Sequence, residues 1–168
     1  MFSMKNDLQR TTIIAFLLFF STLVGYFYVG YYSAVASFWP AAGFYVAFYY
    51  LYKKKALPGI LIGLIIANLG YRIFNADEEI WISFVLTFVF VTGHLAELFV
   101  FNYLLIKMKS NMEKLNQFKN GLKFVGSAIA AVLVGSLISV TALMIAYGTD
   151  DIFTIYFRWA IGDFTGIV

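Results

Sequence analysis

Residues 158–166 have the sequence RWAIGDFTG, which places Arg158 and Asp163 inside an otherwise apolar run near the end of the chain. Ionisable side chains are costly in hydrocarbon, so they tend to face a protein interior or a water-filled cavity and to mark function. This segment therefore indicates a membrane helix that carries functional polar groups. The sequence around it should show how such groups are held at membrane depth.

The composition of the whole chain indicates a membrane protein. Of its 168 residues, 62% are hydrophobic and only 12% are charged, whereas a soluble domain is about half apolar and about a quarter charged. Apolar runs of about 20 residues recur along the sequence, and the alternation typical of barrel strands is missing. We therefore predict an all-α fold, a polytopic transmembrane helical bundle with about six membrane segments that form a single domain over residues 1–168.

Short polar stretches separate the predicted segments. The second segment should begin before Trp39, because the 13 residues between Trp39 and Lys53 make only about 20 Å of helix. Pro40 would then lie in its outer turn; alternatively, Trp39 is an interfacial anchor and Pro40 starts the helix. The fifth segment, rich in small residues, should be a central, tightly packed helix. Apart from the second, the segments are predicted at residues 11–32, 58–74, 80–106, 122–147 (the fifth) and from about 152 onward. The last is expected to be incomplete at Val168.

The loops alternate in charge, which predicts the topology. Residues 1–10, 53–55 and 107–123 are basic, whereas residues 77–79 and 150–151 are acidic. Because basic residues are retained on the cytoplasmic side, the N-terminus should be cytoplasmic. The net charge of +3 therefore reflects topology, and the expected partner is the lipid bilayer and not nucleic acid.

Three ionisable residues are expected to meet in the middle of the bundle. His94 and Glu97 are three residues apart and share a helix face, and His94 lies 13 residues from Lys107, about 20 Å along a helix. Asp163 lies 12 residues beyond Asp151, about 18 Å along its own helix. Such a cluster could relay protons, bind a cation or hold a polar ligand. The alternative is a structural polar cluster that locks the helices together.

Other polar and small residues have more ordinary interpretations. Asn68 is expected to make an interhelical hydrogen bond. Arg158 lies about 140° around the helix from Asp163, so it should extend toward the membrane surface instead of pairing with it. The pairs Gly59/Gly63 and Gly162/Gly166 predict helix-packing faces.

The sequence holds no recognisable catalytic motif. It has no cysteine, no Ser-His-Asp arrangement and no glycine-rich phosphate loop after a strand. Its single histidine excludes a histidine-rich metal site. We therefore predict no enzymatic activity, no metal site and no cofactor.

Three segments together resemble the bacterial membrane-associated sensor domains of the first MASE class. They are FWPAAG at 38–43, GHLAE at 93–97 with YLL at 103–105, and RWAIGDFTG at 158–166. The Pro-Leu pair and final helices expected after the last motif do not occur in residues 1–168. The candidate ligand or signal residues are Trp39, Pro40, Asn68, His94, Glu97, Arg158, Trp159, Gly162 and Asp163.

The resemblance implies a sensory input module in the bacterial cytoplasmic (inner) membrane. Such domains precede histidine kinases of two-component systems or enzymes that make or degrade cyclic-di-GMP, so the implied partner is a cytoplasmic output domain in cis. Signal transduction would proceed by helix repacking. The alternative is a small-solute membrane transporter or its substrate-binding subunit. A homodimer or a membrane partner protein is left open.

Overall fold

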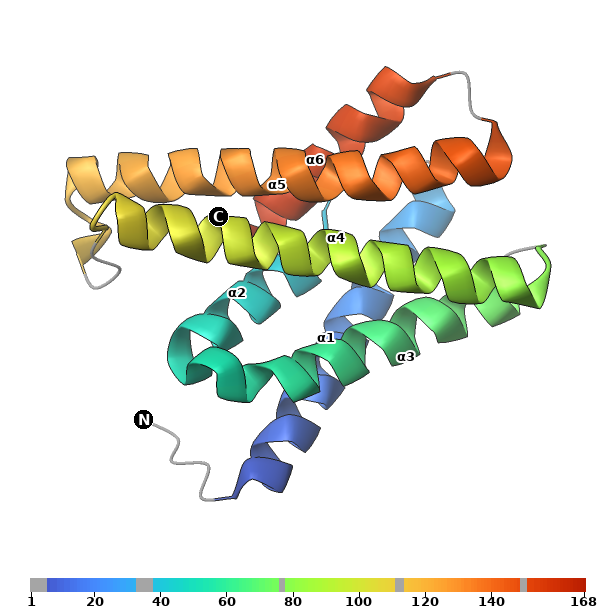
Figure 1. The fold of residues 1–168 in the computed structure, drawn as a ribbon, viewed down its shortest axis with the longest axis horizontal. Coiled ribbons are helices and arrows are strands. Elements are labelled where there is room, and N and C mark those ends of the chain that lie inside the picture. Colours follow the sequence, from blue (N-terminus) through green and yellow to red (C-terminus); the bar gives the residue numbers. More distant parts are fainter. Residues whose placement is uncertain (1–5, 33–37, 76–77, 111–113, 149–150) are drawn as a thin grey trace.

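The structure is a computed structural model that describes residues 6–32, 38–75, 78–110, 114–148 and 151–168, and these residues contain helices and no strand. The all-α polytopic bundle predicted from the sequence is confirmed. Figure 1 shows its elements in chain order, which are α1 (Asp7–Tyr32), α2 (Pro40–Tyr52), the short 3-10 helix η1 (Lys53–Ala56), α3 (Leu57–Asn75), α4 (Ile80–Lys107), α5 (Phe118–Tyr147) and α6 (Ile152–Ile167).

The described helices differ in whether they are long enough to cross a membrane. Four helical stretches are long and apolar enough to cross a membrane, namely Asp7–Phe27, Pro40–Asn75, Ile80–Lys107 and Phe118–Tyr147. The stretch Pro40–Asn75 contains α2, η1 and α3; taken alone, α2 has 13 residues, and α6 has 16. These lengths correspond to about 20 and 24 Å of helix, less than the hydrocarbon core of about 30 Å. The predicted count of about six membrane segments is therefore not confirmed.

The start of α2 corrects one prediction. We expected the helix to begin before Trp39, but it begins at Pro40, with Trp39 as the N-cap. Proline suits the first helical position because its missing N–H would have no partner there. Trp39 is itself buried, and its backbone N–H donates a 2.9 Å hydrogen bond to the Gly162 carbonyl oxygen of α6. Thus Trp39 is no interfacial anchor, and α2 begins inside the bundle.

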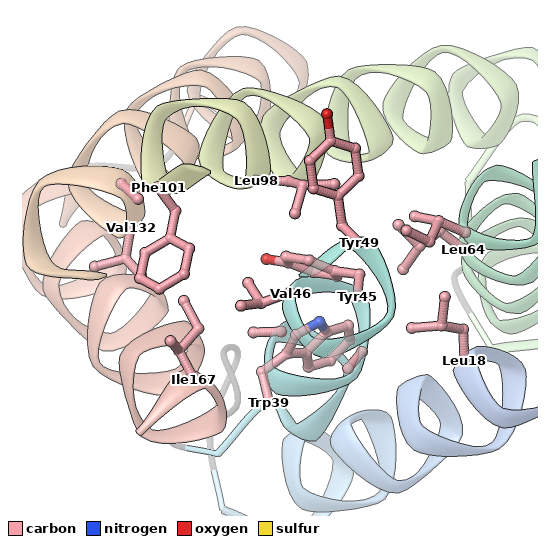
Figure 2. Packing of buried hydrophobic residues seen from close by; sticks show 14 of the residues in the cluster. Leu18, Trp39, Tyr45, Val46, Tyr49, Leu64, Leu98, Phe101, Val132 and Ile167 are labelled. Atoms are coloured by element: carbon pink, nitrogen blue, oxygen red, sulfur yellow. The ribbon is translucent and has the colours of Figure 1, made fainter. Parts of the chain in front are cut away.

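α2 lies in the core and contacts α1, α4 and α6 before η1 turns the chain into α3. Figure 2 shows Trp39, Tyr45 and Val46 of α2 in the middle of the packed side chains. Large residues of the neighbouring helices surround them, including Leu18, Leu64, Leu98, Phe101, Val132 and Ile167. A short helix is therefore the centre of this bundle.

Glycines allow α2 and α6 to touch through their backbones. A Cβ atom added to Gly43 would collide with the Gly166 carbonyl oxygen, and one added to Gly166 would collide with the Trp39 carbonyl oxygen. On the other side of the bundle, added Cβ atoms at Gly59 and Gly63 would press into α1. The predicted packing roles of Gly59, Gly63 and Gly166 are confirmed.

The pairing of α4 with α5 is also close. A Cβ on Gly93 would meet the Ser139 hydroxyl and would lie 3.0 Å from the Gly135 carbonyl oxygen. The tight packing predicted for the fifth helix is confirmed. Its predicted central position is wrong, because its main neighbours in the described residues are α4 and α6, whereas α2 contacts helices on three sides.

The helix ends that precede basic loops and those that precede acidic loops lie at opposite ends of the bundle, as the alternation of loop charge requires. η1, with Lys53, lies at the same end of the bundle as the C-terminus of α4, and the C-termini of α3 and α5 lie at the other end (Figure 1). Asp77 and Asp150, which contributed to the topology prediction, lie outside the described residues. The cytoplasmic N-terminus stays a prediction.

The glycine contacts between α2 and α6 can be tested by adding one methyl group. Gly43→Ala and Gly166→Ala should each destabilise the protein by about 1–3 kcal/mol, because overpacking forces the two backbones apart. Gly126→Ala is the matched control, since nothing lies within 4 Å of a Cβ at this position. Thermal unfolding in lipid nanodiscs, followed by circular dichroism, measures the effect. Gly166→Ala with wild-type stability would contradict the described contact.

Candidate functional site

His94 and Glu97 of α4 and Asp163 of α6 form one buried cluster. Their exposed fractions are 2%, 0% and 1%. The His94 Nδ1 atom lies 3.9 Å from Glu97 Oε2, and one ligand atom from each of the three residues lies within 4.8 Å of the others. The meeting of these helices, expected from residue counts alone, is therefore present. The three residues are also a group that could hold a metal ion.

Aromatic side chains from three helices hold the cluster in place. The Trp39 ring is nearly parallel to the His94 ring, with 6.1 Å between centroids, and the Tyr45 ring lies 5.7 Å from it. The Trp159 side chain hydrogen-bonds to the Asp163 carboxyl group, and its ring packs edge-on against Phe90 at 5.0 Å. These contacts fix the orientation of both His94 and Asp163.

Several polar atoms of the cluster are buried without a hydrogen-bond partner of good geometry. They are His94 Nε2, both Glu97 carboxyl oxygens, Asp163 Oδ2, the Tyr45 hydroxyl and Trp39 Nε1. Most buried polar atoms in proteins are paired, so such a concentration is unusual. Glu97 nevertheless interacts with both the Tyr45 hydroxyl and the Asp163 carboxyl group, so the site is a set of polar groups held close together.

Two backbone features border the site. At Gly135 of α5, an added Cβ would lie 3.1 Å from Glu97 Oε2, so the missing side chain gives the carboxyl group room. The N-terminus of α2 lies beside the cluster, because its N-cap Trp39 stacks on His94. A helix N-terminus carries a partial positive charge, which favours nearby carboxylates.

The remaining predicted site residues have other positions. Asn68 accepts a 2.5 Å hydrogen bond from the Tyr26 hydroxyl and donates one of 2.8 Å to the Leu64 carbonyl oxygen. It therefore joins α1 to α3, as its predicted structural role requires. Pro40 starts α2 and Gly162 accepts the hydrogen bond from Trp39, whereas Arg158 is exposed.

Sequence reasoning missed a second buried polar group. Arg72 donates to Glu78 Oε2 at 2.6 Å and to the Tyr147 hydroxyl at 2.7 Å, and Tyr147 donates in turn to Glu78. The Ser83 hydroxyl donates to Glu78 Oε1 at 2.6 Å, and the guanidinium lies 5.3 Å from the Phe90 ring centroid. An arginine in an apolar run was the available signal, since the same rule singled out Asp163.

Tyr45 was also missed, although it is part of the cluster. Its side chain is fully buried, and its hydroxyl lies beside the Glu97 carboxyl group. A single tyrosine in a segment with many aromatic residues carries no distinguishing signal in the sequence. The sequence indicates only that Tyr45 lies five residues after Pro40, in the helix that the structure places at the centre of the bundle.

The fold and the cluster define a polytopic helical membrane domain with an internal polar site. The family model for MASE1 matches residues 10–168. The chain therefore belongs to the MASE1 family of membrane-associated sensor domains, which the three motif segments resemble. It is a membrane sensory input domain.

The other two comparisons give no relatives. No curated protein matches the chain, and no solved structure matches it.

The Arg72–Glu78 pair should stabilise the packing of α3, α4 and α5. Both side chains are largely buried, with exposed fractions of 9% and 3%. Arg72→Met leaves the carboxylate without its cation and should destabilise the protein by about 3 kcal/mol. The double variant Arg72→Met/Glu78→Gln should be more stable than the sum of the two single effects predicts. Chemical unfolding of all four proteins in nanodiscs measures the coupling, and additive effects would contradict a direct interaction.

Proposed function

We propose that this domain passes a stimulus, by helix repacking, to a cytoplasmic signalling output domain on sequence outside residues 1–168. The output domain would be a histidine kinase or an enzyme of cyclic-di-GMP metabolism. One observation carries the proposal: Asp163, on the last helix, is buried against His94 and Glu97 of α4. A change in this cluster acts directly on α6, the last helix of residues 1–168.

The contact between α2 and α6 supports transmission. Gly43 and Gly166 leave no space between the two helices, so α6 cannot shift without moving α2 or breaking the Trp39–Gly162 hydrogen bond. Packed helices of this kind have discrete arrangements and do not deform continuously. A stimulus then acts by binding one arrangement more tightly than another.

The orientation of the domain follows from its basic ends. With Lys53, Lys54, Lys55 and Lys107 on the cytoplasmic side, the N-terminus is cytoplasmic and α6 enters from the extracytoplasmic side. α6 therefore runs toward the compartment of the output domain. We place the domain in the bacterial cytoplasmic (inner) membrane on this basis and on the family.

A second candidate function is small-solute transport. Its support is the start of α2 inside the bundle beside unpaired polar groups, because transporters use interrupted helices to coordinate substrate. Uptake of a polar solute by liposomes that contain this chain alone would favour transport. Retained signalling by the full-length protein without such uptake would favour the sensor.

The sensory role predicts a specific effect of Asp163→Asn and Glu97→Gln. In the full-length protein, each substitution should change the output by about 5- to 30-fold, the consequence of shifting a two-state equilibrium by 1–2 kcal/mol. The amount of protein inserted in the membrane should not change. Output activity and membrane abundance are measured in the same cells.

Glu79→Gln is the matched control, because it makes the same chemical change as Glu97→Gln at an exposed carboxylate outside the cluster. It should leave the output unchanged. If the substitutions at Asp163 and Glu97 only lower the abundance, with normal output per molecule, the cluster is structural and the sensory site is wrongly placed.

A further inference from the structure

The cluster brings a suitable set of metal ligands together. His94 offers an imidazole nitrogen, and Glu97 and Asp163 each offer a carboxylate oxygen, all within 4.8 Å of one another. Imidazole and carboxylate groups are ligands of zinc and of other first-row divalent ions. In addition, His94 Nε2, both Glu97 oxygens and Asp163 Oδ2 have no hydrogen-bond partner of good geometry and are buried. His94 Nε2 and Asp163 Oδ2 are therefore available to a bound ion, and Glu97 would exchange its interaction with Asp163 for the metal.

The charge of the site also favours a divalent cation. Two carboxyl groups are buried together, and no lysine or arginine in the described residues forms an ion pair with either of them. The buried guanidinium group of Arg72 is paired elsewhere, because it binds Glu78 and Tyr147. Isolated buried carboxylates are strongly unfavourable. One divalent ion would neutralise both.

We propose that His94, Glu97 and Asp163 form a binding site for one divalent transition-metal ion of the zinc type. The site has three protein ligands on two helices, with a fourth position for water or another ligand. Calcium fits poorly, because it requires six to eight oxygen ligands, and magnesium requires six in an octahedron. This proposal replaces the expectation of no metal site, which excluded a histidine-rich site, with the cation-binding alternative that the sequence left open for these three residues.

Neighbouring groups support the three ligands. The Trp39 ring stacked on His94 limits rotation of the imidazole, and the Trp159 hydrogen bond orients Asp163. The buried Tyr45 hydroxyl beside Glu97 can donate to a metal-bound carboxylate. Such partners orient the ligands and typically raise the affinity of a metal site by about 10–100-fold.

Metal binding would link α4 to α6. His94 and Glu97 are on α4 and Asp163 is on α6, and one ligand atom from each lies within 4.8 Å of the others. One ion bound by all three residues would therefore hold Asp163, and with it α6, against α4. The inference thus rests on the proposed sensory function and names its stimulus as the metal ion.

The test uses zinc ions alone and the chain in lipid nanodiscs, stripped first with a chelator. Wild-type protein should bind one equivalent of zinc with a dissociation constant below about 1 µM, measured by competition with a chromophoric chelator. His94→Ala and Asp163→Asn should each weaken binding by more than about 100-fold, because they remove a ligand. Glu79→Gln is the matched control, since Glu79 is an exposed carboxylate, and it should bind like wild type.

A second measurement covers variants that fail to fold. Cobalt(II) added to the wild-type protein should give the strong visible absorption of a four-coordinate site, and one equivalent of zinc should abolish it. Absence of both this absorption and zinc binding in folded wild-type protein overturns the proposal. Binding that all three folded variants retain equally also overturns it, because the metal then lies elsewhere.

The failure of this proposal can be separated from failure of the sensory function. If zinc does not bind but Asp163→Asn still changes the output of the full-length protein, the metal site is wrong and the sensory function stands. If zinc binds through these residues but neither zinc nor Asp163→Asn changes the output, the metal site stands and its sensory role is wrong. A zinc-dependent change of output that Asp163→Asn abolishes supports both.

Discussion

The hydrogen bond from the Trp39 N–H to the Gly162 carbonyl oxygen is the contact on which the rest of the site depends. The bond joins Trp39, the residue before α2, to Gly162, the residue before Asp163. It therefore places the start of α2 against the middle of α6. The bond can form only because Gly43 and Gly166 carry no side chain at the crossing. With the backbones held in this way, Trp39 covers His94 and Asp163 reaches the cluster.

The sequence was a good guide where physical rules are local. Apolar runs predicted the helices, and rise per residue placed His94, Glu97 and Asp163 at similar depths. The position of α2 could not be predicted in this way, because the requirement for a full membrane span argued for an earlier start than Pro40. The central place of α2 and the role of Tyr45 depend on which helices pack together. The small residues of the fifth helix predicted its close packing. They could not show that α5 packs mainly against α4 and α6 and so lies at one side of the bundle.

A helix that begins inside the bundle has consequences for function. The start of α2 at Trp39 gives the site a helix N-terminus, a stacked indole and a short element with neighbours on three sides. Each of these would respond to a change in the charge or geometry of the cluster. The family assignment gives the domain its sensory role, and the proposed metal ion gives a chemical reason for burying three ionisable groups together.

The contact between Asp163 of α6 and His94 of α4 can be measured directly, because the chain has a single histidine. Solid-state NMR in lipid bilayers can report dipolar couplings between the ¹⁵N-labelled His94 ring and ¹³C-labelled aspartate carboxyl carbons. Glu97 is near His94 on the same helix whatever the fold, so only the aspartate label is decisive. The structure predicts a clear coupling to one aspartate, which Asp163→Asn abolishes. A histidine ring that couples to no aspartate would show that α6 does not lie against α4 at this site.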